Sequence, residues 1–294
     1  MLIARLIAET EKCETRLDTL AAQLAEAGMP LAAAAMPADG QGVLELQFDG
    51  DNLAAVLSAI DTVFAPADML VASGPIIVPQ LFVSDMDSTM IGQECIDELA
   101  DYAGLKPQIA AITERAMQGE LDFEAALRER VALLEGLDES AISDCLRDRI
   151  APTPGAATLV ATLSALGTRT VLVTGGFHHF ADPVAQRLGF DRVVGNRLAV
   201  AGGKLTGGLI GPITDSAVKA AVLREELAGL GEGAHSLATG DGANDIPMIE
   251  AATYGFAYRA KPKARAAANG RVDGESLTAV LQLLGIPQID WREA

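Results

Sequence analysis

The chain has 294 residues, 50% of them hydrophobic and 21% charged, which is long enough for two domains with a well-buried core. Its 22 basic residues are scattered among 40 acidic ones, and the formal net charge is −18. Binding to a nucleic-acid backbone needs clustered positive charge, so this composition excludes nucleic acid as a partner. A phosphorylated substrate would need positive charge supplied locally, by a metal ion, a few basic side chains and backbone N–H groups.

The N-terminal residues lack the features of a signal peptide. Arg5 interrupts the only apolar stretch in this region, and acidic residues begin at Glu9. No apolar run in the sequence approaches the length that a membrane span requires. We therefore expect a cytoplasmic protein with no membrane partner.

Residues 1–76 predict a small α+β domain. Apolar residues alternate where strands are expected and recur at three- and four-residue spacing where helices are expected. The expected elements are a strand, a helix, two strands, a helix and a strand, at residues 2–7, 10–27, 31–35, 42–48, 52–64 and 69–72. This βαββαβ order is that of a ferredoxin-like fold, with both helices on one face of the sheet.

Residues 77–294 predict a doubly wound parallel α/β sheet. The apolar run 78–84 forms the first strand, and a helical insertion at 92–150 follows it. The four helices of the insertion are expected at residues 94–102, 108–117, 123–134 and 139–149. Beyond them, helices ending at 166, 188 and 227 alternate with strands at 170–173, 192–194 and 236–239, with a glycine-rich hairpin at 198–209. Ligands bind such sheets at the carboxyl ends of the strands, which directs attention to the loops there.

The motif Asp85-Met86-Asp87-Ser88-Thr89 directly follows the first strand of this sheet. A tight turn can bring both carboxylates to one point, where one can attack phosphorus and the other can transfer a proton. Asp-rich turns also cap helices, and a D-x-D-x-[ST] string arises by chance in about one protein in twenty of this length. The motif alone leaves catalysis and capping equally open.

Two further loops at strand ends carry polar residues. Residues 174–177, Thr-Gly-Gly-Phe, combine a hydroxyl with glycines whose N–H groups can approach an anion at a helix N-terminus. The loop 240–248 contains Asp241 and Asp245, which offer hard oxygen ligands suited to Mg²⁺, although such a loop can also simply cap the next helix. Lys219, on the preceding helix, can bring an ammonium group to a phosphate. The ordered combination favours a site that handles phosphate.

This combination resembles the haloacid dehalogenase (HAD) superfamily of phosphatases. More narrowly, the stretches DMDSTMIGQECIDELA, AMQGELDFEAALRERVALLEGL, VTGGF and GDGANDIPM resemble the phosphoserine phosphatase family. The match runs from residue 80 to about 285 and implies a HAD-like core whose helical insertion acts as a cap. It also implies Mg²⁺-dependent hydrolysis of O-phosphoserine through an aspartyl-phosphate, the last step of serine biosynthesis. Residues 1–76 resemble ACT-like modules through their element order alone.

The resemblance implies a role for each acidic residue of the motifs. Asp85 would be the nucleophile, and Asp87 the acid that protonates the leaving oxygen and later activates water. Mg²⁺ would be held by the Asp85 carboxylate, the Asp87 backbone carbonyl and Asp241, with Asp245 supporting it from nearby. Lys219 would act in catalysis while contacting the phosphoryl group.

The resemblance also implies a set of substrate contacts. They are Glu94, Met117, Phe123, Arg130, Thr174, Gly175, Lys219 and Asn244. Glu94 would meet the substrate ammonium and Arg130 its carboxylate, which the planar fork of arginine suits. The family commonly has Ser where this protein has Thr174, and a β-branched residue is stiffer at χ1, so this position could alter how phosphate is held.

Three functions remain open on the sequence. The first is the phosphoserine phosphatase activity, and the second is a HAD-family phosphatase or phosphotransferase that acts on another small phosphomonoester. The third is a regulatory binder that senses an amino acid through residues 1–76 and has lost turnover, although the presence of Asp85, Asp87, Lys219 and Asp241 argues against it. An amino-acid effector at the N-terminal domain and a homo-oligomer are compatible with each of them.

Overall fold

The computed structural model describes residues 1–7, 13–36, 42–117 and 120–293, except for the side chain of Met117. The N-terminal part contains β1 (Leu2–Ile7), α1 (Cys13–Glu26), β2 (Leu31–Ala35), β3 (Val43–Phe48), α2 (Leu53–Phe64) and β4 (Asp68–Ser73). These strands lie in the order β2-β3-β1-β4, and every neighbouring pair is antiparallel. This order is consistent with the expected ferredoxin-like fold. Residues 10–12 of the expected first helix lie outside the described residues.

The N-terminal part has its own apolar core. Asn52 caps α2, because its side chain accepts a hydrogen bond from the N–H of Ala55 at 3.1 Å. The helix then buries apolar residues at four-residue spacing against the sheet, namely Val56, Ile60 and Phe64. The sheet contributes alternate residues of its strands, among them Leu2, Ala4, Leu6, Leu46 and Phe48. The helical spacing in α2 and the alternation in the strands therefore place one apolar face of each element in the core.

The second part contains the predicted doubly wound sheet. Its strands are β5 (Leu81–Ser84), β6 (Arg169–Phe177), β7 (Arg192–Ala201), β8 (Lys204–Ile210), β9 (Ser236–Gly240), β10 (Tyr254–Tyr258) and β11 (Gly270–Val272). They lie in the order β11-β10-β9-β5-β6-β7-β8, and all pairs are parallel except the hairpin of β7 with β8. The predicted fold class is confirmed.

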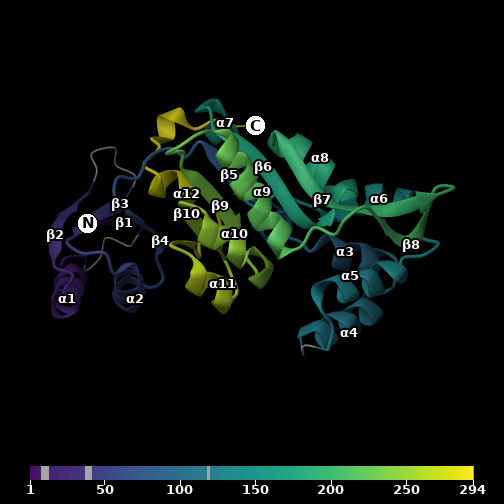
Figure 1. Cartoon of the computed structure of the whole chain (residues 1–294), viewed down its shortest axis with the longest axis horizontal. Coiled ribbons are helices and arrows are strands. Elements are labelled where there is room, and N and C mark those ends of the chain that lie inside the picture. The colour runs from purple at the N-terminus through teal and green to yellow at the C-terminus, as the bar shows by residue number, and fades with distance from the viewer. Residues whose placement is uncertain (8–12, 37–41, 118–119, 294) are drawn as a thin grey trace.

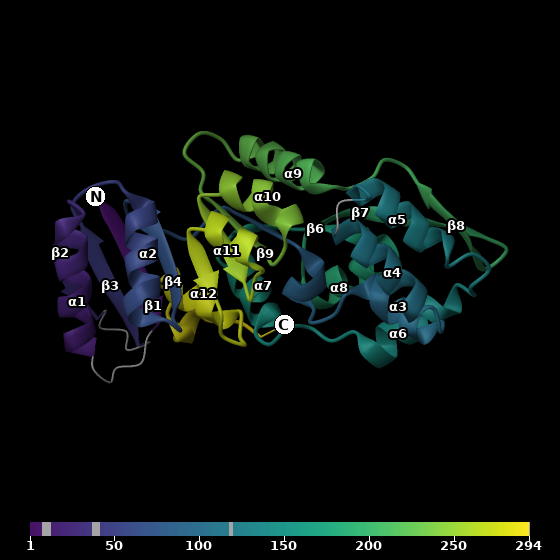
Figure 2. The same ribbon diagram turned by 90° about the horizontal axis from the view of Figure 1, so that it is seen from below.

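Helices cover both faces of this sheet. They are α7 (Ala156–Ala165), α8 (His178–Leu188), α9 (Ser216–Gly229), α10 (Ile246–Ala251), α11 (Pro262–Ala267) and α12 (Thr278–Leu283). Figure 2 shows α9 and α10 on one side of the strands and α7 and α8 on the other. Leu81 and Val83 pack in the cluster that includes residues of α9 and α10, whereas Phe82 faces the opposite cluster. Within the described ranges, no helix has the length and apolar character needed to cross a membrane.

Three strand boundaries differ from those expected by several residues. The first strand begins at Leu81 rather than at residue 78, since Pro79 has no N–H group to donate to a neighbouring strand. The next strand continues past its expected end at Val173 to Phe177, so the Thr-Gly-Gly-Phe segment belongs to β6 and not to a loop. Its neighbour β7 likewise continues to Ala201 and forms one arm of the hairpin.

The insertion forms four helices close to their expected bounds. They are α3 (Cys95–Tyr102), α4 (Lys106–Met117), α5 (Phe123–Ala132) and α6 (Ser140–Arg149). The β7–β8 hairpin holds the connection between α5 and α6, because Gly136 N–H donates to Leu205 C=O and Glu139 N–H to Gly203 C=O, each at 2.8 Å. Figures 1 and 2 show these helices and the hairpin at the end of the molecule opposite the N-terminal sheet.

The N-terminal sheet continues directly into the sheet of the second part. Strand β4 pairs antiparallel with β11, with Leu70 opposite Gly270 and Met69 opposite Arg271. Asn269 extends this junction, because its backbone carbonyl accepts from Val71 N–H at 2.8 Å and its side-chain amide donates to Val71 C=O at 3.0 Å. The described strands therefore form one eleven-stranded sheet.

Candidate active site

Strand β5 delivers two carboxylates to the edge of the sheet. The N–H of Asp85 donates to Thr239 C=O on β9 at 2.9 Å, which extends the pairing of the two strands by one residue. The backbone then turns through η1 (Met86–Met90), where Ser88 has a left-handed φ of 55°. A non-glycine residue in this region is uncommon and marks a constrained turn. The turn aims the side chains of Asp85 and Asp87 into the same cavity.

Lys219 lies beneath the cavity and is 1% exposed. Its Nζ is 2.7 Å from Oδ1 of Asp85 and 2.7 Å from Oδ1 of Asp245. Burial alone would lower the pKa of Lys219, but these two carboxylates raise the pKa above its ordinary value. The other oxygen of Asp245 accepts the N–H groups of Asp241 and Gly242 at 3.1 and 3.0 Å. Asp245 thus links the lysine to the turn after β9.

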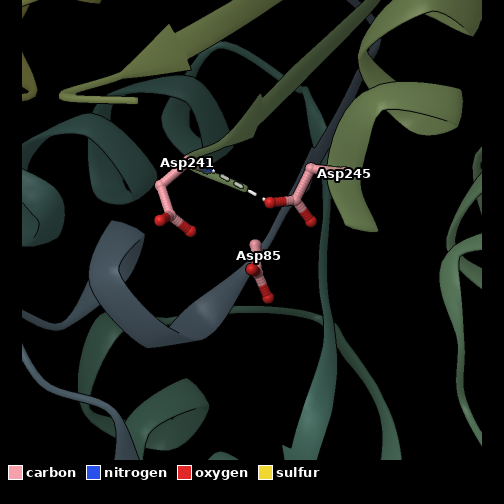
Figure 3. Close-up of side chains that lie close together, drawn as sticks. All are labelled: Asp85, Asp241 and Asp245. Carbon is pink, nitrogen blue, oxygen red and sulfur yellow. Dashed lines mark hydrogen bonds between the residues drawn. The ribbon is translucent and has the colours of Figure 1, made fainter. Parts of the chain in front are cut away.

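Three carboxylates gather where β5 and β9 end. Asp85, Asp241 and Asp245 each offer an oxygen, and these oxygens lie within 4.8 Å of one another (Figure 3). Burial and then Asp245 raise the pKa of Asp85 despite the neighbouring Lys219, and the same two causes raise the pKa of Asp241 to about 6. The exposed ammonium group of Lys261 offsets part of this negative charge, since its Nζ is 3.7 Å from Oδ2 of Asp241. The cluster has an excess of negative charge and hard oxygen donors, which fits a divalent cation.

Asp87 differs from these carboxylates in its surroundings. Its Oδ1 accepts the N–H of Cys95, the first residue of α3, at 3.2 Å. Burial is the largest influence and Glu94 the next, and together they raise the pKa of Asp87 to about 7. A carboxyl group with a pKa near neutrality can give up a proton and take one back, which is what general acid–base catalysis requires.

Residues 174–176 of β6 line the same cavity as Asp87. Thr174 is buried, and its Oγ1 accepts the N–H of Gly176 at 2.8 Å, which leaves the hydroxyl hydrogen free to donate to an anion. A Cβ atom on Gly176 would lie 2.9 Å from Oδ2 of Asp87, and one on Gly175 would lie 3.1 Å from Cζ of Phe123. A side chain at either position would crowd Asp87 or Phe123, so the glycines leave room in the cavity.

Arg130 and Glu94 reach the cavity from the cap. Glu94 accepts a hydrogen bond from Ser88 Oγ at 2.8 Å, which ties the cap to the turn after β5. Arg130 is half-buried, and its Nε donates to Ala126 C=O at 3.3 Å. In the part of the protein that the structure describes, its guanidinium forms no ion pair within 4.0 Å. Burial lowers the pKa of Arg130, although Asp97 and Glu94 oppose this effect. A half-buried cation without a carboxylate partner suits an anionic ligand group.

The structure brings most of the predicted residues together in one cavity. Those that line it are Asp85, Asp87, Glu94, Phe123, Arg130, Thr174, Gly175, Asp241 and Asn244. Lys219 and Asp245 lie behind Asp85 and act on the cavity through it. The side chain of Met117 lies outside the described residues, so its predicted contact stays a prediction.

Sequence reasoning missed several residues of the cavity. Ile96 and Leu127 complete its apolar wall beside the predicted 174–177 segment, and Lys261 lies at its rim beside Asp241. The sequence held a signal for Lys261, because it follows strand β10 and the carboxyl ends of parallel strands meet at one edge of a sheet. The apolar wall had no such signal, since its residues resemble any buried helix face.

Residues 82–250 match the family model of the haloacid dehalogenase-like hydrolases. The chain belongs to this HAD family. Among curated relatives, a phosphoserine phosphatase from Albidiferax ferrireducens is 45% identical over 210 residues, which cover 69% of this chain and 89% of the relative. Other curated phosphoserine phosphatases at 44–45% identity are longer, and this HAD protein spans about half of their length.

Two solved structures extend the similarity to the fold. A HAD family hydrolase from Salmonella enterica serovar Typhi superposes with a TM-score of 0.82 at 28% identity, covering 97% of this chain and 99% of that one. This superposition includes the N-terminal part. A phospho-aspartyl intermediate analogue of phosphoserine phosphatase superposes with a TM-score of 0.63 at 36% identity, covering 69% of this chain and 98% of that one.

Proposed function

We propose that this protein is a Mg²⁺-dependent phosphoserine phosphatase. The observation that carries the proposal is one cavity with Asp85 and Asp87 on its floor and with Arg130 and Glu94 on its cap side, while Lys219 pairs with Asp85 from beneath. The floor suits phosphoryl transfer, and the cap pair suits the carboxylate and the ammonium of an amino acid. The curated relatives named phosphoserine phosphatase support the same substrate.

Asp85 is proposed as the nucleophile. Its Oδ1 accepts from Lys219 Nζ and from the N–H of Met86, both at 2.7 Å, which fixes the orientation of the carboxylate that attacks phosphorus. The P–O ester bond breaks as a new bond to the Asp85 carboxylate forms, and Asp87 gives its proton to the serine oxygen. Water then attacks the aspartyl-phosphate, Asp87 takes up the proton from that water, and phosphate leaves. The solved phospho-aspartyl analogue of a relative supports this sequence of steps.

Mg²⁺ is proposed to be held by the Asp85 carboxylate, the backbone carbonyl of Asp87 and Asp241. When bound, the ion neutralises negative charge on the phosphoryl oxygens. Asp245 is proposed to support the site without serving as a main ligand, because its two oxygens already accept hydrogen bonds from Lys219, Asp241 and Gly242. The excess of buried negative charge is the property of this protein that fits the cation.

Release of phosphate from O-phospho-L-serine, with and without Mg²⁺, tests the proposal. The Asp85→Asn variant keeps the shape of the site but removes the attacking oxygen, so we expect activity to fall by at least about a thousandfold. Mass spectrometry of acid-quenched wild-type enzyme should detect a phosphate adduct at Asp85. Full activity of Asp85→Asn would contradict the nucleophile assignment, and undiminished activity after chelation would contradict the metal role.

A further inference from the structure

The phosphate-binding segment is an irregular part of strand β6. The register between β6 and β7 shifts between Val173 and Phe177, so that the three residues 174–176 face Gly195 alone. A Cβ atom on Gly195 would lie 3.1 Å from the Thr174 methyl group, so a side chain here would crowd the bulged segment where it crosses its neighbour. The bulge displaces residues 174–176 toward the cavity.

One buried amide satisfies the backbone that this bulge leaves unpaired. Asn196, the residue after Gly195, is 1% exposed, and its Nδ2 donates to the C=O of Gly175 at 2.7 Å. Its Oδ1 accepts the N–H of Thr214 at 2.8 Å. A carbonyl must receive a donor and an N–H must receive an acceptor, so this orientation of the amide is the one that satisfies both partners. The bond to Thr214 is buried and the bond to Gly175 is partly buried, and the amide itself is buried, so losing either bond leaves a polar group without its partner.

The peptide between Gly175 and Gly176 connects this amide to the cavity. In a trans peptide the C=O and the N–H point in opposite directions, so fixing the Gly175 oxygen also fixes the direction of the Gly176 N–H. That N–H donates to Oγ1 of Thr174 at 2.8 Å and so determines which way the hydroxyl hydrogen can point. Asn196 thus acts on the Thr174 hydroxyl through one rigid peptide plane.

The second bond of the amide reaches the segment that carries the buried lysine. Thr214 immediately precedes Asp215, whose carboxylate caps α9 by accepting the N–H of Val218 at 2.9 Å. Lys219 follows in the first turns of this helix and contacts Asp85. Asn196 therefore connects the two sides of the phosphate site, the bulged strand and the start of α9.

We infer that Asn196 is a positioning residue for the phosphoryl group, an inference that rests on the proposed function. The Asn196→Asp variant tests it, because a carboxylate can still accept the Thr214 N–H but cannot donate to Gly175. We expect the affinity for inorganic phosphate, measured by calorimetry with Mg²⁺ present, to fall about tenfold, equivalent to about 1.4 kcal/mol. Inhibition by L-serine should change less than about twofold, since serine lacks the phosphoryl group.

Asn269 offers a matched control far from the cavity. Like Asn196, it donates to backbone carbonyl groups and accepts a backbone N–H. The carbonyl groups are those of Val71 and Thr253, and the N–H is that of Gly255. Asn269→Asp should lower the free energy of unfolding without changing phosphate affinity. Unchanged phosphate affinity in Asn196→Asp, or an equal loss in the Asn269→Asp control, overturns the inference.

Turnover of p-nitrophenyl phosphate separates this inference from the substrate assignment. That compound shares only the phosphoryl group with O-phosphoserine, so Asn196→Asp should lower kcat/KM for both by the same factor. A wild-type enzyme that hydrolyses p-nitrophenyl phosphate but not O-phosphoserine would refute the proposed substrate and leave the role of Asn196 testable. If Asn196→Asp does not fold, Gly195→Ala should lower phosphate affinity, and adding Thr174→Ser should restore it by removing the crowded methyl group. Failure of that restoration also overturns the inference.

Discussion

Lys219 and Asp85 form a buried ion pair in which the ammonium nitrogen lies 2.7 Å from one carboxylate oxygen and leaves the other oxygen to the cavity. The same lysine contacts Asp245 at an equal distance. A single cation therefore holds the proposed nucleophile and the turn after β9 in one arrangement.

Replacing this lysine should damage both activity and stability. Lys219→Met leaves two buried carboxylates without their cation, and we expect the free energy of unfolding to fall by about 3 kcal/mol. Phosphate release should fall by at least about a hundredfold, because the carboxylate of Asp85 loses its fixed orientation. Chemical denaturation and steady-state kinetics measure the two effects. Lys263→Met, at an exposed position, serves as the control, and equal stability of the two variants would contradict the structural role of Lys219.

Arg130 should determine whether an amino-acid carboxylate is recognised. Arg130→Ala should raise KM for O-phosphoserine by about a hundredfold, the effect of losing a charged hydrogen-bonding partner. Phosphoethanolamine has the ammonium and the phosphate but no carboxylate, so its kcat/KM should change by less than about threefold. Arg128→Ala, on the exposed side of the same helix, should leave both substrates unaffected. Equal losses on the two substrates would favour another small phosphomonoester as the natural substrate.

Asp241 should control the affinity for the metal ion. Asp241→Asn should weaken Mg²⁺ binding by at least about tenfold, since an amide oxygen is a poorer ligand for a hard cation than a carboxylate. Calorimetric titration without substrate measures this, and Asp144→Asn on the cap surface is the control. With the pKa of Asp241 at about 6 before metal binds, protons compete for the carboxylate, so Mg²⁺ affinity of the wild type should fall as the pH decreases through 6. Affinity independent of pH in this range would contradict the assignment.

Thr174 should tolerate serine but not valine. Thr174→Ser keeps the hydroxyl, and we expect kcat to stay within about threefold while the free energy of unfolding falls by about 1 kcal/mol for the lost methyl group. Thr174→Val keeps the shape and removes the hydroxyl, which should lower kcat by about a hundredfold. Steady-state kinetics and thermal denaturation of the two variants measure these effects. Equal activity of the valine variant and the wild type would exclude the hydroxyl as a phosphate contact.

Glu226 should contribute to stability only when it is ionised. Burial alone would raise the pKa of Glu226, but hydrogen bonds from Arg192 and Arg169 outweigh it and hold the pKa below its ordinary value of 4.5. A lowered pKa in the folded state means that the contribution is complete above 4.5 and is lost as the pH falls through the folded-state value.

The matched pair Glu226→Gln and Glu225→Gln tests this dependence. Glu226→Gln should lower the free energy of unfolding by about 1 kcal/mol at pH 7 and by much less near pH 3. The side chain of Glu225 is 69% exposed and also pairs with Arg192, so its variant should lose less than half as much. Urea denaturation at several pH values gives the comparison, and a loss from Glu226→Gln that does not depend on pH would contradict it.

The sequence predicted the parts of the fold and site that depend on local patterns. Helix and strand periods located most elements up to β9 to within a few residues, because each buries one apolar face, whereas the elements after β9 were not located individually. The rule that ligands lie at the carboxyl ends of parallel strands predicted that Asp85, Thr174 and Asp241 would meet, and they line one cavity. Their individual roles in catalysis stay predictions until the variants are measured.

Features that depend on pairing between distant segments were not predictable in this way. The bulge of β6 arises from its register against β7, so the extended strand and the role of Asn196 became visible only in the structure. The junction of β4 with β11 joins residues separated by about 200 positions, and single edge strands carry no sequence signal for their partners.

The continuity of the sheet from β4 into β11 also limits how the protein can be divided. Cutting between residues 76 and 77 would leave a bare strand edge on each fragment, and an exposed edge invites pairing with other molecules. Asp61 would also be separated from Arg265 and Arg271, two arginines of the catalytic part that it contacts. The predicted amino-acid effector of the N-terminal part should therefore be sought with the intact protein. An effector bound to the N-terminal part would act on a sheet that is joined to the catalytic core by backbone hydrogen bonds.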